Sequence, residues 1–182
     1  METSIIIAGF GGQGVLFAGQ LLAYAGMDNG LHVTWIPSYG PEMRGGTAHC
    51  TVIISDEPIG APMVGQPDVA IALNQPSYLK YEKLVKSGGL LVVNSSLIED
   101  RSERDDIDIV YVRANDIAID AGSSKMLNMA TLGALLARRP ILTIDDLVQS
   151  LIGHLPERKH HLLDANQVVI QKGYEVAQPV TV

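Results

Sequence analysis

The sequence is poor in residues that several classes of protein require. One cysteine, Cys50, stands among 182 residues. The chain can therefore form no internal disulfide, and it cannot supply the four thiolates that an iron–sulfur cluster usually takes. We expect any iron–sulfur centre that serves this protein to lie on another chain.

Basic residues are also scarce. The chain has 13 Lys and Arg against 20 Asp and Glu, which gives a net charge of −7. The basic residues are scattered, and only Arg138–Arg139 and Arg158–Lys159 are adjacent pairs. Nucleic-acid binding normally needs clustered cations that replace the counterions of phosphate groups. We therefore expect no nucleic-acid partner.

Long apolar runs are absent as well. The runs at 5–8 and 69–73 are too short to cross a bilayer, and residues 1–4 lack the positive segment of a signal peptide. We expect a cytoplasmic protein with no membrane contact. Since 47% of the residues are apolar and 18% charged, the chain is long enough for one core, and we predict a single domain over residues 1–182.

Apolar, β-branched runs alternate with helical patterns along the chain, which is typical of an α/β protein. We predict a three-layer, Rossmann-like fold with a mostly parallel sheet and helices on both faces. The strict alternation in the third strand favours an antiparallel orientation. The expected strands are 4–8, 31–36, 47–55, 69–73, 90–94 and 109–113, and the expected helices are 15–27, 76–86, 125–139, 144–155 and 156–176, those after about 143 packing on the domain.

The strongest functional signal is the glycine-rich turn between the first strand and the first helix. Residues 9–14 read GFGGQG and match G-x-G-x-x-G at Gly9, Gly11 and Gly14. Glycine lets backbone N–H groups approach phosphate oxygens, which also meet the positive end of the helix dipole. We predict a phosphate-binding turn. The alternative is a tight turn whose glycines serve packing alone.

The second strand argues against a nicotinamide cofactor. A nicotinamide-binding unit usually carries Asp or Glu at the end of its second strand, about 20 residues beyond the glycines. Here the end of that strand and the two residues after it read Ile36-Pro37-Ser38, without a carboxylate. The pattern therefore disfavours NAD and leaves other phosphorylated ligands open, among them coenzyme A and thiamine diphosphate.

Two more candidates follow strands at the edge where open α/β sheets bind ligands. Arg44 lies in the Pro- and Gly-rich loop 37–46, and its guanidinium suits a phosphate or carboxylate. A solvated pair with Glu42 is the alternative. Asn74 follows the strand 69–73. It is suited to contact a ligand, but we favour a role as cap of the next helix.

The remaining reactive side chains indicate no catalytic site. His49 lacks a partner at metal-ligand spacing and is expected in the core or at an interface, and Cys50 is expected in the core. Adjacent helical residues point about 100° apart, so the pair His160–His161 is expected on a solvated face. We predict no catalytic residue and no metal site on this chain.

Three segments resemble the gamma subunit of 2-oxoacid:ferredoxin oxidoreductases. They are GFGGQGV from Gly9, PSYGPEMRGGTAHC from Pro37 and PDVAIALNQPS from Pro67. The similarity is dense from residue 5 to about 81, and the middle segment is most similar to the 2-oxoglutarate type. His49 departs from the family pattern, in which Asn is expected, so we assign it no role.

This resemblance implies one subunit of a larger enzyme. Alpha, beta and, where present, ferredoxin-like delta subunits would hold thiamine diphosphate and the iron–sulfur clusters, convert a 2-oxoacid to an acyl-CoA and pass electrons to ferredoxin. The isolated chain would be inactive. In related single-chain enzymes the corresponding domain helps to bind coenzyme A. By resemblance, the residues near the coenzyme A phosphates would be Gly9, Gly11, Gly12, Gln13 and Gly14, with Arg44 and Asn74 beside them.

Three other interpretations remain open. One is the smaller subunit of an indolepyruvate oxidoreductase, which belongs to the same family. Another is a free-standing NAD-dependent dehydrogenase. The third is a structural scaffold whose glycines pack against their neighbours and bind nothing.

Overall fold

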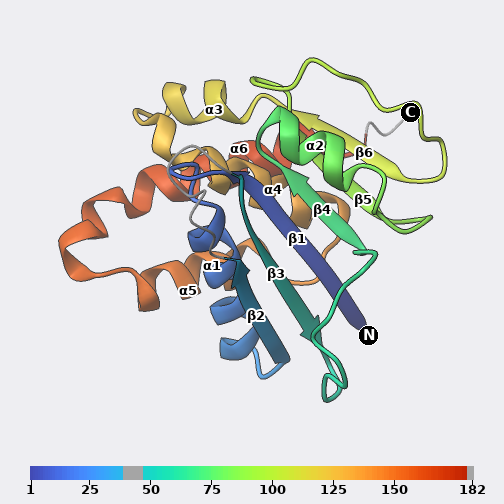
Figure 1. Ribbon diagram of the computed structural model, residues 1–182. Helices are drawn as coiled ribbons and strands as arrows, with labels where there is room; N and C mark the ends of the chain where they lie inside the picture. The colour runs from blue at the N-terminus through green and yellow to red at the C-terminus, as the bar shows by residue number, and fades with distance from the viewer. Residues whose placement is uncertain (39–46, 180–182) are drawn as a thin grey trace.

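The structure is a computed structural model that describes residues 1–38 and 47–179. Within these residues, six strands form one sheet in the order β2-β3-β1-β4-β5-β6 (Figure 1). β3 is antiparallel to both of its neighbours, and every other adjacent pair is parallel. The mostly parallel sheet and the reversed third strand are thus confirmed. The strands are β1 (Glu2–Phe10), β2 (His32–Ser38), β3 (Thr47–Ser55), β4 (Val69–Ala72), β5 (Leu90–Asn94) and β6 (Asp108–Val112).

The helices agree with the sequence pattern except in four places. The short helix α3 was not predicted, and α2 ends earlier than expected. The helices expected at 125–139 and 156–176 begin as the separate 3-10 helices η2 and η3. The helical elements are α1 (Val15–Asp28), α2 (Gln75–Tyr81), α3 (Ala114–Asp120), η2 (Ser124–Met126), α4 (Leu127–Arg138), α5 (Ile144–His154), η3 (Glu157–Leu162) and α6 (Leu163–Ala177).

Helices lie on both faces of the sheet, but unequally (Figure 1). Side chains of α1, α4, α5 and α6 join the larger core, whereas α2 supplies the helical part of the smaller core on the other face. In β1, Ile5 and Ile7 face the larger core, and Ile6 and Ala8 face the smaller one. A strand covered on both faces must be apolar at consecutive positions. The predicted three-layer arrangement is therefore confirmed.

The edge strand β2 extends two residues beyond its predicted end. Its final residues, Pro37 and Ser38, pair with Cys50 and His49 of β3. Proline cannot donate a backbone hydrogen bond, but a strand at the edge of a sheet has one side without a partner strand. The edge position of β2 therefore accommodates Pro37, which the sequence pattern assigns to a loop.

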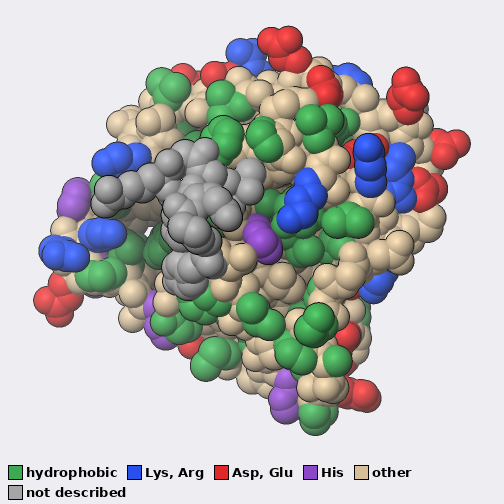
Figure 2. Space-filling model, in the orientation of Figure 1, with side chains coloured by type: hydrophobic (Ala, Val, Ile, Leu, Met, Phe, Trp, Pro, Cys, Tyr) green, Lys and Arg blue, Asp and Glu red, His purple; other side chains and the backbone are tan. Residues whose placement is uncertain are grey.

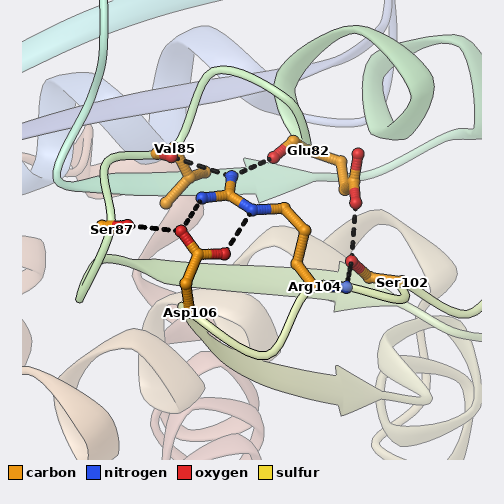
Figure 3. A network of polar contacts seen from close by, with 6 residues as sticks. All are labelled: Glu82, Val85, Ser87, Ser102, Arg104 and Asp106. Atoms are coloured by element: carbon orange, nitrogen blue, oxygen red, sulfur yellow. Dashed lines mark hydrogen bonds and ion pairs between the residues drawn. The ribbon is translucent and has the colours of Figure 1, made fainter.

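The loop between β5 and β6 is held down by a cluster around Arg104 (Figure 3). Nη1 of Arg104 donates to the carbonyl oxygens of Glu82 and Val85, both at 2.8 Å, just beyond the end of α2. Nε and Nη2 donate to the two carboxylate oxygens of Asp106 at 2.8 and 2.6 Å. Two of these four hydrogen bonds therefore fasten the loop to the segment after α2, and the other two join residues within the loop.

Candidate functional site

The glycine turn lies at the carboxyl end of β1, where the direction of sheet growth changes. From β1 the chain continues to β2 and β3 on one side, and it later adds β4, β5 and β6 on the other. Open α/β sheets bind ligands in the crevice at such a switch point, beyond the carboxyl ends of the strands. The predicted phosphate turn therefore occupies the ligand-binding edge of this sheet.

Close packing and backbone geometry explain three of the four glycines. A Cβ atom on Gly9 would lie 2.6 Å from Oε1 of Gln13 and 2.9 Å from Cβ of Leu73. Gly12 and Gly14 have φ angles of 97° and 74°, a region that side-chain-bearing residues rarely adopt. A Cβ on Gly14 would also lie 2.5 Å from Nδ2 of Asn128. The turn therefore adopts a shape that requires glycine at positions 9, 12 and 14.

Gln13 braces the turn against the end of β4. Its Oε1 accepts a hydrogen bond from the backbone N–H of Phe10 at 2.6 Å. Its Nε2 donates to the carbonyl oxygen of Leu73 at 3.1 Å. Because both ends of the amide are engaged within the chain, the geometry gives Gln13 the role of positioning the turn.

Helix α1 begins at this turn. Its N-cap residue is Gly14, no side chain among the described residues caps it, and its first turn contains no acidic residue. Backbone N–H groups at a helix start attract anions, helped by the helix dipole. A cavity of about 260 Å³ adjoins the turn, and its lining includes Phe10, Gly11, Gly12, Gly14, Phe17 and Ala48.

The side-chain oxygen and nitrogen of Asn74 differ in their hydrogen bonding. Its Oδ1 accepts a hydrogen bond from the backbone N–H of Ser77 at 2.9 Å, which caps α2 and confirms the predicted cap. Its Nδ2 is buried without a partner among residues 1–38 and 47–179, as is Oγ of Ser77, and the two residues are only 2% and 1% exposed. Leaving a buried polar group unpaired costs about 1–3 kcal/mol. These two atoms therefore have unused hydrogen-bonding capacity at the end of β4.

Asn128 and Asn94, which were not predicted as site residues, donate hydrogen bonds to backbone carbonyl oxygens at the edge of the site. Nδ2 of Asn128, on α4, donates to the carbonyl oxygen of Gly14 at 3.1 Å. Nδ2 of Asn94, at the end of β5, donates to the carbonyl oxygen of Leu73 at 3.2 Å. A polar residue closing an apolar strand signals Asn94 in the sequence. Nothing in the sequence marks Asn128, because its contact joins residues 114 positions apart.

Of the other candidates, Arg44 is outside the described residues, whereas His49 and Cys50 pair with Ala8 and Ile7 of β1, just before the glycine turn. His49, on β3, is half-buried, and its pKa is lowered by burial and by the nearby charge of Lys80. Cys50 is fully buried in the core, as predicted, and burial raises its pKa to about 11. A thiol with so high a pKa is unreactive at neutral pH.

Metal-binding side chains do not gather in the part of the chain that the structure describes. No group of three or more His, Cys, Asp or Glu residues is arranged to hold an ion within residues 1–38 and 47–179. His160 and His161 are both exposed, as predicted. Nε2 of His160 lies 2.8 Å from the carbonyl oxygen of Leu155. This carbonyl contact gives His160 a local structural role.

The sheet and the turn together define a class of protein. A parallel-rich sheet with a glycine turn opening its first helix is a Rossmann-like arrangement that suits phosphorylated ligands. Residues 4–176 match the family described as pyruvate ferredoxin/flavodoxin oxidoreductase. The chain belongs to this family, which confirms the resemblance seen in its sequence.

Curated relatives share this similarity along nearly the whole chain. The ketoisovalerate oxidoreductase subunit VorA of Methanothermobacter marburgensis is 36% identical over 177 residues, which cover 97% of this chain and 37% of VorA. The 2-oxoglutarate synthase subunit KorC of Methanocaldococcus jannaschii is 33% identical over 181 residues, which cover 98% of this chain and 95% of KorC. The chain thus spans little more than a third of VorA but nearly all of KorC.

Two solved structures have the same fold. The gamma subunit of a keto/oxoacid ferredoxin oxidoreductase from Geobacter sulfurreducens PCA is 30% identical with a TM-score of 0.82, covering 96% of this chain and 98% of that subunit. A chain of the 2-oxoglutarate:ferredoxin oxidoreductase from Magnetococcus marinus, solved with 2-oxoglutarate, coenzyme A and succinyl-CoA, is 25% identical with a TM-score of 0.89. The match covers 99% of this chain and 32% of that one. Within the described residues, no helix is long and apolar enough to span a membrane.

Proposed function

We propose that this chain is the gamma subunit of a 2-oxoacid:ferredoxin oxidoreductase of the 2-oxoglutarate type, and that its glycine turn holds the phosphates of coenzyme A. Relatives of equal length, KorC and the Geobacter gamma subunit, support the subunit assignment. The coenzyme A in the Magnetococcus enzyme supports the ligand.

One observation supports the anion site directly. At the carboxyl edge, and within the part of the chain that the structure describes, the start of α1 carries no side-chain cap and Nδ2 of Asn74 is buried without a partner. Both are hydrogen-bond donors, so they are suited to phosphate oxygens, which accept hydrogen bonds and carry negative charge. We infer that the phosphates lie between the first turn of α1 and Asn74.

The strand order favours coenzyme A over NAD. In the dinucleotide-binding fold the second strand lies next to the first, and its terminal carboxylate holds the adenosine ribose. In this sheet, the antiparallel strand β3 separates β1 from β2. The end of β2 is therefore displaced by one strand from the glycine turn, and it carries Pro37 and Ser38 instead of an acidic residue.

The redox chemistry is assigned to partner chains. The lone thiol, Cys50, is buried in the core and cannot hold a cluster. We propose that alpha and beta subunits bind thiamine diphosphate and, with a ferredoxin-like delta subunit where present, the iron–sulfur clusters that reduce ferredoxin. Purified alone, this chain should not reduce ferredoxin from 2-oxoglutarate and coenzyme A.

The test uses the assembled enzyme, purified anaerobically with its native partners. Asn74→Ser keeps an oxygen that can cap α2 but removes the amide donor. We expect the KM for coenzyme A to rise about tenfold, because a hydrogen bond to a charged group is worth about 1.5–3 kcal/mol. The KM for 2-oxoglutarate should not change, since the substrate would bind on partner chains.

A matched control accompanies this measurement. Asp105→Asn changes an exposed side chain in the loop between β5 and β6 and should leave both KM values unchanged.

Two further measurements test the rival functions. A panel of dicarboxylic and aryl 2-oxoacids separates the 2-oxoglutarate type from the indolepyruvate type. Purification of the chain without partners, together with saturable binding of NAD but not coenzyme A, would instead establish the free-standing dehydrogenase.

A further inference from the structure

The two faces of strands β2 and β3 are covered differently. On the α1 side, these strands contribute Trp35, Cys50 and Val52 to the larger core or its margin. On the α2 side, the smaller core includes residues of β1, β4 and β5 but none of β2 or β3 in the described part of the chain. In Figure 1, accordingly, no described helix crosses the front of β2 and β3. One face of this strand pair therefore has no helical layer within residues 1–38 and 47–179.

Four partly exposed side chains lie on this uncovered side, which we call the open face. They are Ile36 and Ser38 of β2 and His49 and Thr51 of β3. The register places them there: His49 pairs with Ala8 of the smaller core, and Ser38 pairs with His49. Residues paired across antiparallel strands share one face of the sheet. Ile36, which pairs with Thr51, is 44% exposed.

The open face has the composition of a protein interface. None of its four residues is Lys, Arg, Asp or Glu, and neither is any of the seven residues of the edge strand β2. Strand faces in contact with water are usually polar, and edge strands are commonly protected by charged side chains. Depletion of charge is typical of the centre of a protein–protein interface. The composition therefore favours a face that another polypeptide covers.

A single lysine borders the open face. Nζ of Lys80 lies 4.9 Å from the centroid of the Tyr81 ring, and the ring of His49 lies 6.0 Å from the same ring. Lys80 is exposed and forms no salt bridge with any residue in the described ranges. Burial and the charge of Lys80 lower the pKa of His49, so its imidazole is neutral at pH 7. Figure 2 shows a blue and a purple side chain near the middle of this face, and no red side chain touches either of them in this view.

Two relatives join the same domain to further polypeptide. The matched region is 37% of VorA and 32% of the Magnetococcus chain, whereas it is 95% of KorC. Domains within one chain commonly share an interface of about 600–1,500 Å². The additional polypeptide in the two longer chains is therefore a suitable occupant for an uncovered face of this domain.

We propose that the open face is the docking surface for the partner subunit that corresponds to the remainder of VorA, and that an apolar segment of this partner places a carboxylate against Lys80. This inference rests on the proposed function, because it requires a partner subunit. The net charge of −7 repels acidic segments from most of the surface, whereas Lys80 attracts them. The lysine thus selects where an acidic segment binds, and the uncharged strands accept its apolar side chains.

Zero-length crosslinking of the assembled enzyme tests the charged contact. A carbodiimide activates a carboxylate, and the amine of a lysine in contact with it then forms an amide bond. Mass spectrometry should find Lys80 joined to an Asp or Glu of the partner subunit. The matched control is Lys83, which is exposed and lines a different cavity with Glu82 and Glu103, so it should form no link to the partner. Absence of the Lys80 link, or its formation to a second copy of this chain, would overturn the proposal.

Two variants test the charge and the apolar contact separately. The Kd for assembly is measured by sedimentation as the complex dissociates on dilution. Lys80→Glu should raise this Kd about tenfold, and Lys83→Glu should leave it within about twofold. Ile36→Asp should raise it about tenfold or more, because it buries an unpaired charge in the interface. Val168→Asp is the control for Ile36→Asp, since Val168 on α6 is similarly exposed, at 46%, and it should change the Kd less than about twofold.

The outcomes separate this inference from the function on which it rests. Unchanged Kd values for Lys80→Glu and Ile36→Asp would show that the open face is not the docking surface. Activity of the same complex with coenzyme A would then leave the proposed function standing. If the chain assembled with no other polypeptide, both proposals would be wrong. The crosslink is measured on the unaltered protein, so it decides the case even if Ile36→Asp fails to fold.

Discussion

Strands β1 and β4 lie side by side, yet the two ends of this pair are built in opposite ways. At the amino end, Asp68 accepts hydrogen bonds on Oδ2 from the backbone N–H and the hydroxyl of Ser4, at 2.8 and 2.5 Å. Lys86 donates to the other oxygen of Asp68 at 2.9 Å. At the carboxyl end, Asn74 and Ser77 each keep a buried polar atom that has no partner among the described residues.

This difference separates stability from function within one pair of strands. Closed polar networks stabilise the fold, whereas buried polar groups without partners lower its stability and persist where a ligand completes them. The cluster around Arg104 follows the pattern of the amino end, since its guanidinium is engaged by two carbonyl oxygens and one carboxylate (Figure 3). The proposed phosphate site lies at the carboxyl end of this pair of strands, where Asn74 and Ser77 have such atoms within the described residues.

The largest effect is expected at the carboxyl edge, from Gly14→Val. The left-handed φ of 74° disfavours valine by about 1–2 kcal/mol, and contact with buried Asn128 adds about 1–3 kcal/mol of overpacking. The thermal midpoint should fall on the order of 10 °C. Gly60→Val is the control, because a Cβ there meets no atom within 4 Å. Equal midpoints for the two variants would show that the turn is not constrained as described.

The next effect is expected at the amino end, from Asp68→Ala. Removing this carboxylate leaves Ser4 and Lys86 without their partner, which should lower the free energy of unfolding by about 2 kcal/mol. Urea unfolding measures this loss. The control Asp105→Ala, at an exposed position, should stay within about 0.5 kcal/mol of the wild type. In the assembled enzyme, the KM for coenzyme A should be unchanged in Asp68→Ala, and an increase would contradict the division between the two ends.

The same carboxylate makes the stability of the amino end depend on pH. Burial alone would raise the pKa of Asp68, but hydrogen bonds from Ser4 and Lys86 outweigh it, so the pKa is lowered. A lowered carboxyl pKa stabilises the fold above the unfolded value of about 3.9, and this contribution is lost as pH falls through the folded pKa. The difference in unfolding free energy between wild type and Asp68→Ala should therefore be full at pH 6 and smaller at pH 3. A constant difference would contradict this origin.

Local patterns in the sequence predict strands and the caps of helices. The run 69–73 predicts a buried strand, and Asn74 predicts the helix cap that follows it. Likewise, Thr143 and Asp146 predict the capping box that starts α5, in which each side chain accepts from the other's backbone N–H. Such signals succeed because a cap or a turn depends on residues within one helical turn of each other.

Contacts between distant segments escape this reasoning. The partnership of Ser4 with Asp68 spans 64 positions, and that of Asn128 with Gly14 spans 114. The stacking of Tyr24 on His154 depends on how α5 packs against α1, so neither residue carries a signal of this contact in the sequence. A sequence pattern shows which face of an element is apolar but not which element will cover it.

The smallest effect on stability is expected at Asn74, where stability and coenzyme A affinity can be compared at one residue. Asn74→Ala removes both the cap of α2 and the free Nδ2, so unfolding free energy should fall by about 1 kcal/mol and the KM for coenzyme A should rise. Asn74→Ser keeps a capping oxygen, so it should recover most of the stability but not the affinity. Urea unfolding and the KM of the assembled enzyme separate these effects. If the two variants lost stability and affinity in the same proportion, the higher KM would come from a disordered α2 and not from a lost phosphate contact.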